Sequence, residues 1–254
     1  MLLTVDIGNT NIKLAVFDNN ERITFDMLDS TLIDFRSFIL SFLYKANIRE
    51  TQIDDSILSS VVPSLTEPVV QALKEITNKE PFIIDNKNHY GIEISEKITD
   101  EVGSDLLVAG AYSYQMYNKE LILVSLGTAT VFAHISIDGK FSSCIIAPGF
   151  ESYVKSLYEK AEKLPEFTPE KNNTFLSTST VSAMNVGAYD GFIGMVKYLL
   201  IGMKTELGST PMIVGCGGVG KNVAPYITDL DTYNADLVTE GLNFIYNRYI
   251  KWNK

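Results

Sequence analysis

Residues 4–18 read TVDIGNTNIKLAVFD: two apolar runs with a short turn of glycine, asparagine and threonine between them. A glycine at such a turn lets the backbone bend tightly and approach a ligand closely. The runs at 2–7 and 12–18 are short and rich in β-branched and aromatic residues, as is typical of strands. The stretch therefore predicts a strand, a turn facing a ligand and a second, neighbouring strand.

A second stretch, LVSLGTATVFAHISIDGK at residues 123–140, repeats this outline. Asp6 stands two residues before the first turn glycine, and Ser125 stands at the corresponding place in the second copy. Either turn alone also fits an ordinary β-hairpin with polar turn residues. The agreement of both outline and chemistry favours a duplicated unit, in which the second copy lacks the carboxylate.

The rest of the chain alternates helical and strand patterns. Apolar periodicity predicts helices at 30–48, 64–77, 103–118, 148–164, 180–207 and 239–252, with short strands at 56–63, 81–85 and 211–216. Ser30 is the expected N-cap of the first of these helices. We place a domain boundary near 116–120, so that residues 1–117 and 118–254 each form a mixed sheet flanked by helices. The expected fold class is α/β, with the ligand between the two halves.

Composition limits the classes of partner and the cellular location that we expect for this protein. The 254 residues are 46% hydrophobic and carry a formal charge of −10, and no cluster of Lys and Arg stands out, which argues against nucleic acid as a partner. Cys144 and Cys216 are far apart in sequence, and we expect two buried free thiols. The start MLLTVDIG has no basic region, and no apolar run approaches the roughly 18–20 residues of a membrane span. We therefore expect a cytoplasmic protein with no membrane partner.

The turn residues suit an anionic ligand held by uncharged groups. The first turn offers donors at Gly8, Asn9, Thr10 and Asn11, with Lys13 within reach, and the second offers Gly127, Thr128 and Thr130 from an opposite wall. Two such turns could hold a polyphosphate. Asp6 is suited to order a hydrated Mg²⁺, which uses few protein carboxylates. The glycine-rich segment GCGGVG at 215–220 fits either part of an adenosine-binding site or a simple tight turn.

Seven motifs occur in order along the chain: DIGNTNIKLAVFD, VGSDLL, LGTAT, IAPGFESYVKSLYEKAEKLPEF, STVSAMNVGAYDGFIG, GCGG and TEGL. Together they resemble type III pantothenate kinases. That family belongs to the superfamily of acetate kinase, sugar kinases, heat-shock proteins and actin. The resemblance implies two duplicated ribonuclease H-like domains around a central ATP cleft.

The resemblance also implies an activity: transfer of the γ-phosphoryl group of ATP to the hydroxyl of pantothenate. The product is 4'-phosphopantothenate, in the first step of coenzyme A biosynthesis. The implied cofactors are ATP, Mg²⁺ and a monovalent cation, K⁺ or NH₄⁺, and the implied assembly is a homodimer.

Site residues follow from the motif positions. Asp105 matches the catalytic aspartate, although its place at a helix start also fits a simple N-cap. The implied ATP contacts are Asp6, Gly8, Asn9, Thr10, Asn11, Lys13, Gly127 and Thr128, and the implied pantothenate contacts are Gly103, Ser104, Asp105, Leu106 and Thr180.

Two departures from the family pattern bear on function. Ser125 stands where the family has an aspartate that binds the monovalent cation, and Leu106 stands where an arginine is usual. A carboxylate ~4–5 Å from a cation contributes about 3–4 kcal/mol at an effective dielectric constant near 20, before desolvation. The cation site should therefore be weak or absent, giving a reduced or cation-independent activity. Two alternatives remain open: a kinase of another small alcohol, and a weakened homologue that binds nucleotide as a regulatory or accessory protein.

Overall fold

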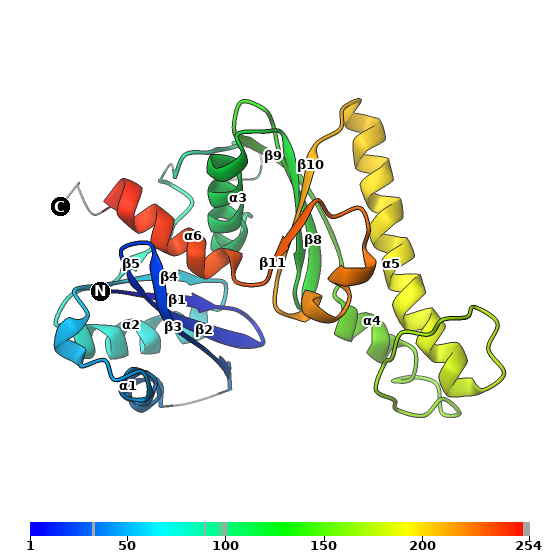
Figure 1. The fold of residues 1–254 in the computed structure, drawn as a ribbon, viewed down its shortest axis with the longest axis horizontal. Helices are drawn as coiled ribbons and strands as arrows, with labels where there is room; N and C mark the ends of the chain where they lie inside the picture. Colours follow the sequence, from blue (N-terminus) through cyan, green and yellow to red (C-terminus); the bar gives the residue numbers. More distant parts are fainter. Residues whose placement is uncertain (32–33, 89, 97, 99–100, 251–254) are drawn as a thin grey trace. The chain divides into compact units, whose positions relative to one another are not determined.

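The computed structural model describes residues 1–31, 34–88, 90–96, 98 and 101–250, which form two compact units (Figure 1). The first unit comprises Met1–Asn118, Gly139–Phe141 and Leu237–Lys254, and the second comprises Lys119–Asp138 and Ser142–Asp236. The division of the duplicated domains at residues 117 and 118 stays a prediction.

The first unit is built on a mixed five-stranded sheet. Its order is β3 (Glu21–Asp29), β2 (Asn11–Asp18), β1 (Leu2–Ile7), β4 (Asp55–Ser60) and β5 (Phe82–Ile83). Strands β1 and β2 are antiparallel, as the opening stretch of sequence predicts, and β1, β4 and β5 run parallel. The parallel strands therefore end at the same edge of the sheet as the β1–β2 turn.

Helices cover both faces of this sheet. Helices α1 (Phe35–Lys45) and α2 (Pro63–Thr77) bury their apolar side chains against one face. Helices α3 (Ser104–Tyr117) and α6 (Leu237–Ile245) pack on each other and on β1 and β4 (Figure 1). The predicted N-cap at Ser30 is wrong: Asp34 caps α1 by accepting a hydrogen bond from the backbone N–H of Ser37 at 3.0 Å.

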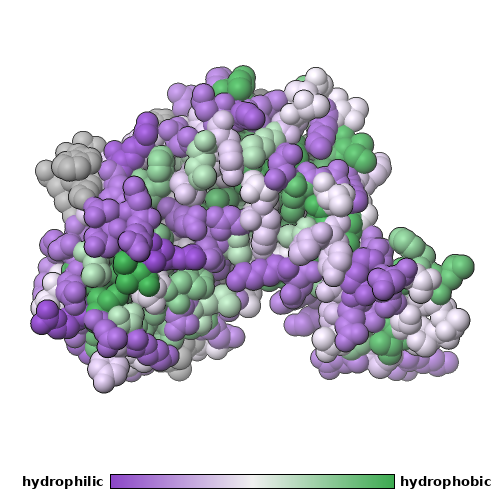
Figure 2. All heavy atoms as spheres, viewed as in Figure 1, coloured by the Kyte–Doolittle hydropathy of each residue, from purple (hydrophilic) through white to green (hydrophobic). Residues whose placement is uncertain are grey.

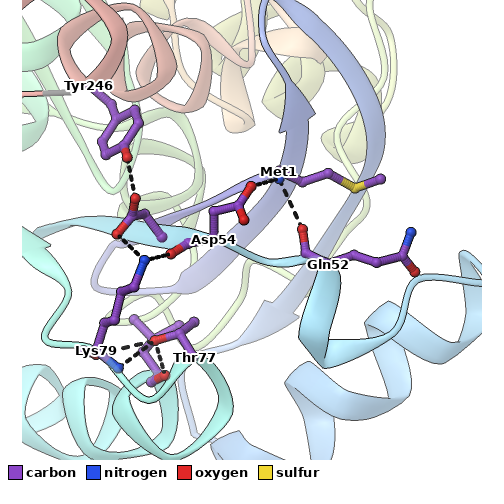
Figure 3. Close-up of polar contacts among 8 residues, drawn as sticks. Met1, Gln52, Asp54, Thr77, Lys79 and Tyr246 are labelled. Atoms are coloured by element: carbon purple, nitrogen blue, oxygen red, sulfur yellow. Dashed lines mark hydrogen bonds and ion pairs between the residues drawn. The ribbon is translucent and has the colours of Figure 1, made fainter. Parts of the chain in front are cut away.

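Polar contacts join the amino ends of the parallel strands to α6 and to the end of α2 (Figure 3). The Met1 ammonium lies 2.5 Å from the Asp54 carboxylate, and the Lys79 ammonium donates to the Asp54 carbonyl oxygen at 2.6 Å. The buried Asp55 accepts a hydrogen bond from the Tyr246 hydroxyl, in the π-helical turn Tyr246–Ile250 that continues α6, and pairs with Lys79 at 3.5 Å. This network anchors the end of the sheet opposite the β1–β2 turn.

The second sheet repeats the topology of the first. Its order is β11 (Thr232–Asn234), β10 (Met212–Cys216), β7 (Leu121–Leu126), β8 (Ala129–Ile135), β9 (Lys140–Pro148) and a short edge strand β6 (Glu93–Ile94). Strands β7 and β8 are antiparallel, while β7, β10 and β11 are parallel. Without β6, the strands correspond one by one to those of the first sheet, with β7 in the place of β1. The duplication inferred from the two turns is therefore present in the strand order.

One face of the second sheet is covered by helices α4 (Phe150–Ser156) and α5 (Thr180–Leu207). Among the described residues, α5 is the helix whose length and hydropathy would also suit a membrane span. Its apolar character has a simpler source, because buried residues such as Phe192, Val196 and Leu200 pack against the sheet.

The two cysteines differ in environment. Cys216 is buried at the end of β10, as expected, whereas Cys144 is exposed on β9, contrary to expectation. Neither cysteine forms a disulfide.

Candidate active site

The β1–β2 turn is held in shape by its own chain. The backbone N–H of Gly8 donates to the Asn11 carbonyl oxygen at 3.0 Å. Ser30, at the end of β3, donates its hydroxyl to the Gly8 carbonyl oxygen at 2.8 Å and its N–H to the Thr10 carbonyl oxygen at 2.9 Å. Asn9 and Thr10 are exposed at the tip. The turn is thus preformed, with its tip open to a ligand.

Three polar side chains lie in a row across the sheet behind this turn. Asp6 on β1 is the register partner of Lys13 on the antiparallel strand β2 and of Ser59 on the parallel strand β4. Register partners in a sheet point to the same face. The row Lys13–Asp6–Ser59 therefore faces the same side, which is the side where the first turn of α3 meets β4.

Asp6 is almost fully buried, with 7% of its surface exposed. Burial raises the pKa of this carboxyl to about 7; the Lys13 ammonium lowers the pKa, and the neighbouring Asp105 carboxylate raises it further. A carboxylate in this position is stabilised by any cation that approaches it. Asp6 and Asp105, far apart in sequence, are therefore close enough in the fold to interact.

Asp105 is the second residue of α3, after the N-cap Gly103, so the simple N-cap alternative is wrong. Its carboxylate accepts the backbone N–H of Leu106 at 2.8 Å. Burial raises the pKa of Asp105, and this effect outweighs the lowering by the backbone N–H groups of Leu106 and Asp105 and by the Lys13 ammonium. The raised pKa suits a general base.

In the second unit, the β7–β8 turn is one residue shorter than its counterpart. Leu126 pairs with Thr130, and the N–H of Gly127 donates to the Ala129 carbonyl oxygen at 3.1 Å. The Thr130 hydroxyl is buried and donates to the Pro148 carbonyl oxygen at 3.1 Å, so this residue braces the turn.

The residue after Pro148 is a glycine for a steric reason. A Cβ on Gly149 would overlap the carbonyl oxygens of Gly127 and Thr128. Backbone therefore packs directly on backbone at this turn. Gly217, at the end of β10, makes a similar approach from another loop: its φ is +101°, and a Cβ there would lie 2.7 Å from the Leu126 carbonyl carbon.

We expect Gly149→Ala to destabilise the protein by about 1–3 kcal/mol, because the added methyl group must displace the turn. The midpoint of urea unfolding measures this change. Gly194→Ala on α5, where a Cβ meets nothing within 4 Å, is the matched control and should be neutral or slightly stabilising. Equal midpoints for the Gly149 variant and the parent would contradict the close packing.

The row behind the second turn carries no ionised group. Ser125 on β7 is the register partner of Val131 on β8 and of Cys216 on β10. Compared with Lys13–Asp6–Ser59, the second copy has lost both the carboxylate and the lysine. The two turns therefore follow the same strand arrangement, but only the first has charged side chains behind it.

A pocket of about 390 Å³ lies beside the glycine-rich segment that follows β10. Lys221, Pro225, Thr228, Thr232 and Tyr233 are among the residues that line it. The Tyr233 hydroxyl donates to the carbonyl oxygen of Gly217 and so fixes the loop to the pocket wall. The segment is therefore a tight turn with a cavity of its own beside it.

The implied ATP contacts Asp6 to Lys13 and the substrate loop Gly103–Leu106 lie in the first unit. Gly127, Thr128, Ser125 and Thr180 lie in the second unit, where Thr180 is the exposed first residue of α5. The roles of these residues as ligand contacts stay predictions. Ser59 and Gly149 were missed from the sequence, because only strand register and backbone packing reveal them.

Comparison with known proteins bears on both family and fold. The sequence profile of a family described as type III pantothenate kinase matches residues 2–201. A type III pantothenate kinase of Agathobacter rectalis is 30% identical over 254 residues, covering 98% of this chain and 97% of that protein. One from Geotalea uraniireducens is 32% identical over 253 residues, covering 98% of each chain.

Solved structures share the fold at low identity. A Campylobacter jejuni protein assigned to the Baf family of transcriptional activators has a TM-score of 0.61 at 19% identity, covering 99% of this chain and 100% of that one. Component A of (R)-2-hydroxyglutaryl-CoA dehydratase from Acidaminococcus fermentans has a TM-score of 0.56 at 12% identity, covering 100% and 99%. The activator of 2-hydroxyisocaproyl-CoA dehydratase from Clostridium difficile, solved with ADPNP bound, has a TM-score of 0.56 at 10% identity, covering 99% and 96%. These likenesses confirm the expected α/β fold of duplicated ribonuclease H-like domains.

Proposed function

The chain belongs to the type III pantothenate kinase family, and we propose that it transfers the γ-phosphoryl group of ATP to the hydroxyl of pantothenate, with Asp105 as the general base. One observation supports the role of Asp105: its carboxylate interacts electrostatically with Asp6 and Lys13, behind the preformed β1–β2 turn. Family membership makes the protein a kinase that uses ATP.

Phosphoryl transfer depends mainly on alignment and charge compensation. In the proposed reaction the pantothenate hydroxyl oxygen forms a bond to the γ-phosphorus, and the bond from that phosphorus to the β–γ bridging oxygen breaks. The hydroxyl proton passes to an Asp105 carboxylate oxygen. The raised pKa of Asp105 favours this proton transfer, and its hydrogen bond to Leu106 holds the carboxylate at the start of α3.

The first turn is proposed to bind the ATP phosphates through Gly8, Asn9, Thr10 and Asn11, with Lys13 as the nearby cation. The buried Asp6 carboxylate fits a hydrated Mg²⁺, because an approaching cation relieves the cost of ionising it. Bound Mg²⁺ would supply compensation for the phosphate charge. In the second unit, Gly127 and Thr128 are proposed as nucleotide contacts, and the pocket beside Gly217 is proposed as the adenosine seat.

The residues around Ser125 do not fit a monovalent cation site. The row Val131–Ser125–Cys216 offers one hydroxyl and no carboxylate. We therefore propose that turnover is independent of K⁺ and NH₄⁺.

Ser125→Asp tests this departure. The parent should change less than twofold in rate when KCl replaces choline chloride, whereas the Ser125→Asp enzyme should gain a K⁺ dependence of tenfold or more. Ser125→Asn, of similar size but uncharged, is the control and should gain none. A parent enzyme that K⁺ stimulates tenfold would show that other groups bind the ion.

The second departure from the family pattern concerns the residues that would bind the acceptor, pantothenate. Leu106 cannot form the charged pair with the pantothenate carboxylate that an arginine would form. Gly103 and Thr180 are the other proposed acceptor contacts. The KM for pantothenate is therefore expected to be higher than in an enzyme with an arginine at this position.

The decisive experiment incubates pure protein with Mg²⁺, ATP and pantothenate and detects 4'-phosphopantothenate by mass spectrometry. Parallel reactions contain sugars or other small alcohols. Product from pantothenate alone supports the proposal. Product only from another alcohol would show that pantothenate is not the substrate. Nucleotide binding without any product would show that the protein is not a kinase of these alcohols.

We also propose a homodimer formed through α5, in a cytoplasmic enzyme with no nucleic acid or membrane partner. Along the outer side of α5, Tyr198 and Ile201 are 76% and 57% exposed. Figure 2 shows apolar atoms over the outer edge of α5 and over the loop before it. Sedimentation equilibrium measures the assembly.

A further inference from the structure

We propose that Ser104 is a positioning residue: its hydroxyl ties the start of α3 to the end of β4 and thereby sets where Asp105 stands relative to Asp6. The inference rests on the proposed function for its kinetic consequence, because Asp105 is the proposed base. It gives Ser104 a role other than contact with substrate.

The Ser104 hydroxyl is buried, with 8% of the residue exposed, and all its hydrogen-bonding capacity is used within the protein. It donates to the carbonyl oxygen of Ser60 at 3.0 Å and accepts the backbone N–H of Ser60, also at 3.0 Å. It lies 2.9 Å from the Ser59 hydroxyl, which can donate to its second lone pair. A serine hydroxyl has one donor and two acceptor sites, so none is left for a ligand.

These contacts connect the two carboxylates through a short path. Ser59 is fully buried and is the register partner of Asp6 on the adjacent strand. Ser104 contacts Ser59 and Ser60 from the first residue of α3, and Asp105 is the next residue. The bridge therefore joins the strand pair that carries Asp6 to the helix that carries Asp105.

Other contacts hold the segment before α3, so loss of the bridge should move Asp105 without unfolding the unit. The Asn86 side chain donates to the carbonyl oxygen of Val102 at 2.6 Å. Helix α3 also packs along its length on α6. The expected defect is a displaced carboxylate on an intact scaffold.

The test compares Ser104→Ala with Ser113→Ala. Ser113 lies on the same helix, is fully buried, and its hydroxyl has no hydrogen-bond partner among the described residues. Both variants lose one buried hydroxyl, but only the first loses the bridge. Because small misplacements of reacting groups cost up to about 100-fold in rate, we expect Ser104→Ala to lower kcat by about 10- to 100-fold with KM for ATP within about twofold. Ser113→Ala should keep the parent kcat and KM.

Two further variants identify the bridge as the cause. Ser104→Thr keeps the hydroxyl and should recover most of the parent kcat. Ser59→Ala should have a smaller effect than Ser104→Ala, and the double variant should be no slower than Ser104→Ala alone, because both substitutions break one connection.

Crystal structures of the parent and of Ser104→Ala give a readout that does not depend on activity. The Asp105 carboxylate should move relative to Asp6 in the variant. If the parent makes no 4'-phosphopantothenate, the proposed function fails, and this displacement alone decides the positioning role. An unmoved Asp105, a kcat within twofold of the parent, or an equal loss in Ser113→Ala overturns the inference.

Discussion

Asp105→Asn should lower kcat by about 10²- to 10⁴-fold, because a general base contributes that much to proton transfer. The amide keeps the size of the carboxyl group and an oxygen that can accept the Leu106 N–H. KM for ATP should stay within about twofold, because the phosphates are assigned to the β1–β2 turn. Steady-state kinetics with ATP and pantothenate measures both parameters.

Asp34→Asn is the matched control for this substitution. Asp34 is also a carboxylate at the start of a helix that accepts a backbone N–H, from Ser37 at 3.0 Å, but it caps α1 on the surface. Its kcat should equal that of the parent. An Asp105→Asn enzyme that retains more than a tenth of the parent kcat would remove Asp105 from the role of base.

Asp6→Asn should have opposite effects on nucleotide binding and on stability. The variant loses the carboxylate assigned to Mg²⁺, so the heat of binding of Mg²⁺ and ATP should disappear in calorimetry. Stability should instead rise near neutral pH, because the parent must ionise a buried carboxyl group that the amide replaces.

The direction of this stability change follows from the pKa of Asp6, which is about 7 in the folded protein and 3.8 for an unperturbed group. Between these values the folded state holds a proton that the unfolded state has released, so the parent loses stability as pH rises from about 4 to 7. At pH 8 the Asp6→Asn protein should be more stable by on the order of 2–4 kcal/mol, and near pH 4 the difference should vanish.

Urea unfolding of both proteins without ligand at pH 4, 6 and 8 measures this difference. Asp18→Asn, at the exposed end of β2, is the control and should follow the parent at each pH. A parallel pH dependence for the parent and Asp6→Asn would show that Asp6 titrates normally.

Much of the scaffold was accessible from local sequence pattern. The β1–β2 and β7–β8 hairpins were predicted from apolar runs around a glycine turn, and the structure confirms both. Helix ends were harder, because capping depends on competing contacts. Ser30 looks like an N-cap in the sequence, but its hydroxyl is used by Gly8 of the neighbouring turn.

The candidate site could be predicted only in part. Asp6 and Lys13 face each other within one hairpin, so their interaction follows from local register. Ser59 joins their row from a strand about fifty residues later in the chain, and no local pattern indicates which of its serines pairs with Asp6. The contacts of Gly149 with Gly127 and Thr128 also depend on tertiary packing, because they are steric and leave no periodic signal in the sequence.

The packing of α6 on β1, β2 and β4 has a consequence for biosynthesis. The ribosome produces these strands well before α6, so they cannot be covered by this helix until residues 237–245 have been made. The second unit consists of residues 119–138 and 142–236 and does not include that helix. On the ribosome, the half that is made later is therefore the first that can complete its fold.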